Sequence, residues 1–174
     1  LDIEAWARYS VYEALTQSAH ADNVHNWRIY YDPWRGKLVP MVWDPMGWRD
    51  TMRGKKFQSE IRASLLMEKL FVHDEFLRIR GRILREFFES GKDGEFMNFV
   101  KRKIDVMKQE VLTDPLLKPA SPAQVSGAMQ RLQTHIEFVF KHLKAEALSQ
   151  KHSMRGAKSD SVVKRHGEKP VITW

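Results

Sequence analysis

The sequence predicts an α+β domain that is mostly helical and carries one β-hairpin near its N-terminus. Apolar residues recur at helical spacing in residues 2–17 and through most of residues 59–150. Between these regions, two short segments rich in aromatic and β-branched residues flank a turn sequence. Apolar residues make up 43% of the 174 residues, enough to bury a core, which argues against general disorder.

The N-terminal elements are expected in a definite order. Residues 2–17 form an amphipathic helix, for which Asp2 is the expected N-cap. Strands at 27–31 and 37–43 flank a turn at 32–36 and together predict a β-hairpin. Pro40 favours an edge position or a bulge in the second strand, because proline donates no ladder hydrogen bond. Residues 44–58 are basic and are expected to be irregular.

Residues 59–150 are expected to be helical throughout, which gives about four to five helices in all. One apolar face begins at Ile61, and a second ends at Ser90-Gly91. A third ends at Asp114-Pro115, and a fourth follows the prolines at 119 and 122. The shared apolar stripes of these helices are expected to form the core.

The predicted domain spans residues 1–150, and residues 151–174 are expected to be a basic linker and the start of a following module. The net charge is +7, of which +4 falls in residues 151–174. Because the chain begins with Leu1 and shows no signal-peptide pattern, we expect a piece excised from a longer protein. No apolar run reaches the ~18 residues that a membrane span requires, and the absence of cysteine excludes a disulfide scaffold.

The residues most suited to chemistry lie on both sides of the hairpin. Asp22 and Asn26 precede the first strand, and Asp44 follows the second. The outer ends of paired strands lie about 5 Å apart, so the hairpin is expected to bring these three side chains to one end. Two carboxylates and an amide oxygen suit Mg²⁺ or Mn²⁺. Capping and turn roles, which Asp and Asn commonly have before strands, are the alternative.

This region resembles the spore-coat CotH kinase family, which has a reduced, atypical protein-kinase-like fold. Residues 22–31 read Asp-Asn-x-x-Asn-Trp-Arg-Ile-Tyr-Tyr, and residues 37–44 read Lys-Leu-Val-Pro-Met-Val-Trp-Asp. The family pattern has the same order: an aspartate, an asparagine, an aromatic strand, a turn, and Trp-Asp after the next strand. The resemblance covers residues 1–60, and the later helices agree in general character with the helical C-terminal lobe of the family.

The resemblance implies transfer of the γ-phosphate of ATP to serine or threonine in a protein substrate. Asp22 would be the catalytic aspartate that orients the attacking hydroxyl and accepts its proton. Asn26 and Asp44 would be the cofactor-binding residues, which hold Mg²⁺ or Mn²⁺ against the phosphates. The family's N-terminal lobe, expected upstream, would complete the nucleotide pocket. The resemblance also implies an extracytoplasmic or cell-surface location in bacteria.

Two other functions remain open. Met46 stands where the family usually has a second acidic residue, which favours a non-catalytic surface or adhesion module on the same fold. Nucleic-acid binding is suggested only by the isoelectric point of about 9.7 and the basic tail, and no recognition motif supports it. Arg49 and Arg53 are expected to be solvated, although they stand near enough to the site in sequence to contact phosphates.

Several aromatic and histidine residues surround the candidate site in the sequence. Trp27 and Trp43 are expected to pack in the core. Trp34 or Trp48, if exposed, would be available to stack on an adenine or to contact a partner. His20 and His25 flank Asp22, and both are expected to be ordinary loop residues; orienting a carboxylate is the alternative role for His25.

Overall fold

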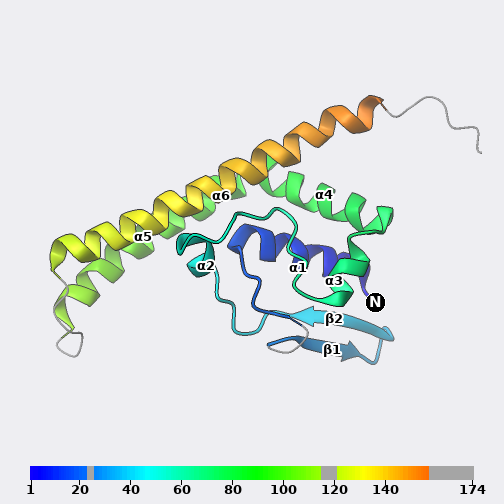
Figure 1. The fold of residues 1–174 in the computed structure, drawn as a ribbon, viewed down its shortest axis with the longest axis horizontal. Coiled ribbons are helices and arrows are strands. Elements are labelled where there is room, and N and C mark those ends of the chain that lie inside the picture. The colour runs from blue at the N-terminus through cyan, green and yellow to red at the C-terminus, as the bar shows by residue number, and fades with distance from the viewer. Residues whose placement is uncertain (23–25, 115–120, 157–174) are drawn as a thin grey trace, which may run out of the picture.

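The protein is an α+β domain, mostly helical, with one two-stranded antiparallel sheet. The computed structural model describes residues 1–22, 26–114 and 121–156. Within these ranges the elements follow in a set order (Figure 1): α1 (Ile3–Thr16), β1 (Arg28–Asp32), β2 (Lys37–Met41), α2 (Arg49–Met52), α3 (Leu65–Leu70), α4 (Asp74–Glu89), α5 (Lys92–Thr113) and α6 (Pro122–Gly156). The expected helix at 2–17 and the expected hairpin are both confirmed.

Helix α1 lies between the hairpin and the long helices (Figure 1). Its N-cap is Asp2, as expected, and the Asp2 carboxylate accepts a hydrogen bond from the backbone N–H of Ala5 at 3.1 Å. Trp6, fully buried, donates its indole N–H to the carbonyl of Leu38 at 2.9 Å. This bond and the backbone contact from Asp2 to Leu38 fix β2 against the N-terminal end of α1.

The core forms where α1, α3 and α4 meet the antiparallel pair α5 and α6 (Figure 1). Large buried side chains come from several helices: Trp6, Met67, Phe76, Ile136 and Leu143. Aromatic rings connect the helices, and Phe140 of α6 lies 5.8 Å from Phe87 and 5.7 Å from Phe96. The apolar stripes expected for the later helices therefore supply much of the core, although Phe99 and Met107 of α5 are exposed.

Residues 59–64 are not helical, and here the expectation of continuous helix from residue 59 is wrong. Helix α3 begins at Leu65, because Ser64 caps it by accepting the N–H of Met67 at 3.2 Å. The preceding backbone is held by side chains from other elements: Gln17 bonds both backbone groups of Gln58. Arg80 donates to the carbonyl of Ser59. These side-chain partners replace the helical hydrogen bonds that the segment does not make.

Helix α2 lies within residues 44–58, so the expectation that this segment is wholly irregular is wrong. The ends of α4 and α5 follow the expected signals. Helix α4 ends before Ser90, and Gly91, with a φ of 77°, starts the next helix. Helix α5 ends at Thr113, with Asp114 as its C-cap. Helix α6 extends to Gly156, six residues past the expected domain boundary. Residues 157–174 lie outside the described residues, so the following module remains a prediction.

None of the helices in the described ranges combines the length and the hydropathy that a membrane crossing needs. This agrees with the expectation from the sequence.

Candidate functional site

Asn26 and Asp44 lie at the open end of the hairpin, as the sequence predicts. Arg28 pairs with Met41 at the last rung of the ladder, so Asn26 precedes this rung and Asp44 follows it. Both residues have a left-handed backbone, with φ of 55° for Asn26 and 43° for Asp44. Asn and Asp tolerate this conformation better than most residues. The chain therefore turns sharply at both positions, immediately outside the paired strands.

His20 joins the two residues. Its Nε2 atom lies 2.6 Å from the side-chain nitrogen of Asn26 and 3.4 Å from Oδ2 of Asp44. The nitrogen and oxygen of an Asn amide are interchangeable by a flip, so either atom of Asn26 can be directed at this point. The Asp44 side chain is 60% exposed, which leaves its carboxylate accessible to a ligand from solvent. The side chains of Asn26 and Asp44 thus both lie against His20 Nε2.

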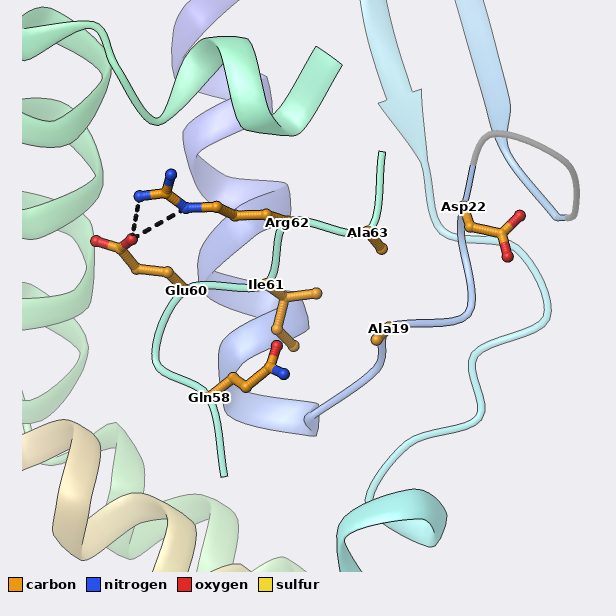
Figure 2. Close-up of a pocket in the computed structure, with 7 residues that line it drawn as sticks. All are labelled: Ala19, Asp22, Gln58, Glu60, Ile61, Arg62 and Ala63. Carbon is orange, nitrogen blue, oxygen red and sulfur yellow. Dashed lines mark hydrogen bonds and ion pairs between the residues drawn. The ribbon is translucent and has the colours of Figure 1, made fainter. Parts of the chain in front are cut away.

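Asp22 occupies a neighbouring position on the wall of a shallow pocket of about 590 Å³. The other residues that line this pocket are Ala19, Gln58, Glu60, Ile61, Arg62 and Ala63. Figure 2 shows the Asp22 carboxylate turned away from Gln58 and Arg62. In the described part of the chain, no three His, Asp or Glu side chains gather closely enough to hold a metal ion. The structure thus brings Asn26 and Asp44 together, and it does not add Asp22 to their shared point.

The pocket wall is polar and firmly held. Arg62 forms an ion pair with Glu60 at 2.6 Å (Figure 2). The Arg62 guanidinium also lies 4.9 Å from the centre of the Phe71 ring. Gln17, the left-handed C-cap of α1, donates to the carbonyl of Gln58 at 2.8 Å and accepts its N–H at 3.0 Å. This two-point contact fixes the segment that follows α2 against the end of α1.

Met46 contacts a basic side chain. Its sulfur lies 3.9 Å from Nη1 of Arg49, the first residue of α2. Arg49 is exposed, as expected, and Trp48 anchors the start of α2 by donating its indole N–H to the carbonyl of Leu15 at 2.8 Å. The segment after Asp44 is therefore tied to α1, which limits how far Asp44 can move.

The aromatic residues of the hairpin are not buried and exposed in the way that the sequence predicts. Trp27 packs edge-on against Trp6 at 6.1 Å between ring centres, as expected for a core residue. Trp43 was expected in the core, and this is wrong: it is 52% exposed, with the Arg28 guanidinium 5.5 Å from its ring centre. Trp34, at the tip, is 95% exposed.

This arrangement suits a divalent cation that takes only one or two of its oxygen donors from the protein and the rest from a bound phosphate and water. Mg²⁺ is commonly bound through one or two protein oxygens together with phosphate and water, because it gives up its water reluctantly. Asn26 and Asp44 supply such a pair at the end of the hairpin: Asn26 is half-buried, and the Asp44 carboxylate is exposed to solvent. His20 is the site residue that sequence reasoning assigned no role; its position two residues before Asp22 was the only signal. His25 lies outside the described residues.

No protein-family model, curated protein or solved structure matches this chain.

Proposed function

We propose that this chain is the C-terminal lobe of an atypical protein kinase that resembles the spore-coat CotH kinases. One observation carries the proposal: Asn26 and Asp44, separated by the whole hairpin, converge on one point at its open end. The order of the surrounding elements, with a helix before Asp22 and a hairpin between the two ligands, supports it.

In this proposal Asn26 and Asp44 bind Mg²⁺ or Mn²⁺ and replace the contacts they make with His20. The cation and ATP supply the phosphoryl group and neutralise its charge. Asp22 orients the hydroxyl of a serine or threonine on a protein substrate and accepts its proton. Because phosphoryl transfer requires positioning and charge neutralisation more than covalent chemistry, these oxygen-bearing side chains are sufficient for this lobe's share of the reaction.

An N-terminal lobe of the same protein completes the nucleotide site in this proposal. Arg62, the basic residue on the wall of the pocket that Asp22 lines, is already paired with Glu60. A lobe that brings a basic residue to the phosphates would supply what is missing. The resemblance to the spore-coat family further favours an extracytoplasmic place of action in bacteria.

The cation site is tested by titrating the chain with Mn²⁺, with and without ATP, and counting free Mn²⁺ by electron paramagnetic resonance. We expect Asp44→Ala and Asn26→Ala each to weaken Mn²⁺ binding by about tenfold or more, since each removes one of two protein oxygens. Asp105→Ala, which removes an exposed carboxylate on α5, is the matched control and should bind as the wild type does. Equal binding by all four proteins would refute the site.

Transfer itself is tested in a protein that also carries the upstream lobe. We expect Asp22→Asn to lower the rate of phosphate incorporation into a serine-containing protein by about a hundredfold or more, while Mn²⁺ binding is retained. Wild-type rates in the Asp22→Asn and Asp44→Ala variants would show that the assignment is wrong.

A non-catalytic surface module is the second candidate, and two observations favour it. Met46 offers no oxygen where the family usually has an acid, and Trp34 is almost fully exposed at the hairpin tip. Exposed aromatic side chains on rigid turns are typical of protein-binding surfaces. If this candidate is correct, ATP with Mg²⁺ leaves the melting temperature unchanged, and Asp44→Ala alters stability only.

A further inference from the structure

Strand β1 leaves one edge of the sheet open. It lies on the side of β2 that faces away from α1 (Figure 1). Ile29 is opposite Pro40, and Tyr31 is opposite Leu38, whose carbonyl accepts hydrogen bonds from α1 and its cap. Since proline has no N–H and the Leu38 carbonyl points outward, these two pairs exchange no hydrogen bonds inside the hairpin. The backbone N–H and C=O of Ile29 and Tyr31 therefore point away from β2.

In the described part of the chain, no other backbone group bonds to these outward groups of β1. The opposite edge of the sheet differs. There, the Leu38 carbonyl accepts the N–H of Asp2 at 3.1 Å and the indole N–H of Trp6 at 2.9 Å, and Pro40 offers no donor. The sheet thus has one edge that can be extended and one that is closed.

The sequence of β1 is complementary to itself in the antiparallel direction. Residues 28–32 read Arg-Ile-Tyr-Tyr-Asp. If two copies are aligned antiparallel about Tyr30, Arg28 of each faces Asp32 of the other, and Ile29 of each faces Tyr31 of the other. Opposite charges, and an aromatic residue beside a β-branched one, are favourable cross-strand pairs. A shift by one residue removes both charge pairs.

The same alignment satisfies the outward backbone groups. Ile29 and Tyr31 carry the free N–H and C=O groups, and they face each other in this register. Each such pair exchanges two hydrogen bonds, as a closely spaced pair of an antiparallel ladder does. We propose that β1 pairs antiparallel with β1 of a second copy of this chain, so that the two hairpins form one sheet across a twofold axis.

The side chains of β1 fit this use. Ile29, Tyr30 and Tyr31 are exposed by 41%, 51% and 57%, although all three are large and apolar or aromatic. On one face of the joined sheet, Leu38 and Tyr31 of one copy continue into Ile29 and Pro40 of the other, which buries an apolar row. Because each chain has a single open edge, association ends at the dimer and does not continue into a fibre.

Analytical ultracentrifugation over a range of concentrations tests the pairing with a charge exchange. We expect the wild type to show a monomer–dimer equilibrium. Arg28→Asp and Asp32→Arg each place like charges together twice per dimer, so each alone should raise the dimer dissociation constant by at least about tenfold. An equimolar mixture of the two variants restores opposite charges at both ends and should form a heterodimer of wild-type affinity. Arg78→Asp, an equal charge change at an exposed position on α4, is the control.

The Asp32 carboxylate also accepts the N–H of Trp34 and of Arg35 in the turn, so a substitution of Asp32 changes the turn as well as the strand. A second variant tests the pairing without changing the turn. Ile29→Pro removes only an outward N–H and should leave a folded monomer by circular dichroism. A wild type that stays monomeric at every concentration, dimers that persist in Arg28→Asp and Ile29→Pro, or species larger than a dimer would each overturn the proposal. Asn26 and Asp44 are unchanged in all these variants, so the result is independent of the proposed cation site.

Discussion

Glu13 is a buried acid, and it makes the stability of the fold depend on pH. Its side chain lies on α1 inside the core and is only 1% exposed. Burial raises its pKa from the ordinary value of 4.5 to about 8, although a hydrogen bond from the Tyr9 hydroxyl acts in the opposite direction. Within the part of the chain that the structure describes, the second carboxylate oxygen, Oε2, has no hydrogen-bond partner. Glu13 is therefore protonated in the folded protein at neutral pH.

The sign and size of the effect follow from these pKa values. Between pH 4.5 and about 8, the folded protein holds a proton that the unfolded chain has released. The free energy of unfolding therefore falls as the pH rises through this window. At about 1.4 kcal/mol for each pKa unit, the loss between pH 5 and pH 7 is on the order of 2 to 3 kcal/mol.

Glu13→Gln removes the titration and keeps the shape and the acceptor for Tyr9. We expect its stability to vary by about 2 to 3 kcal/mol less than that of the wild type between pH 5 and pH 7. Urea denaturation at a series of pH values measures this difference directly. Glu110→Gln, which changes an exposed residue of α5, is the control and should keep the wild-type slope. The same slope in the wild type and Glu13→Gln would show that Glu13 is ionised in the folded state.

Three further substitutions test how the elements are held together. Asp2→Ala should lower the free energy of unfolding by about 1 to 2 kcal/mol near neutral pH, as measured by urea denaturation. The backbone N–H of Ala5, and then Arg35, hold the pKa of Asp2 below 3.8. The effect of the substitution should therefore shrink as the pH falls below that value. Trp6→Phe removes the indole N–H that binds the Leu38 carbonyl, and should lower stability by about 2 kcal/mol and speed amide exchange in β2, as measured by NMR. Arg80→Leu leaves the Ser59 carbonyl and the buried Ser10 hydroxyl without their donor, and should cost about 3 kcal/mol by urea denaturation. A loss below about 0.5 kcal/mol in any of the three would mean that the bond concerned does not stabilise the fold.

Local signals were sufficient to predict most of the fold. The Asp2 cap, the turn between the strands and the breaks at Gly91 and Asp114 each depend on neighbouring residues, which a sequence displays directly. The segment 59–64 could not be predicted in this way. Its backbone is satisfied by Gln17 and Arg80, which are distant in the chain, so its apolar residue Ile61 looked like part of a helix.

The candidate site could likewise be predicted only as far as local sequence signals reach. A hairpin must bring its two outer ends together, which is why Asn26 and Asp44 could be paired from their places beside the strands. The contact of both with His20 depends on how the chain returns from α1, and no local pattern encodes that path. The exposure of Trp43 has a similar cause, since it depends on what covers the hairpin and not on the residue itself.

Paramagnetic broadening by Mn²⁺ in the amide NMR spectrum tests most directly whether the end of the hairpin binds a divalent cation. At low Mn²⁺, we predict that the signals of Asn26, including its side-chain amide, and of Asp44 and His20 broaden first, and that Asp44→Ala abolishes this order. Broadening spread evenly over exposed carboxylates such as Asp105, and unchanged in Asp44→Ala, would contradict the account.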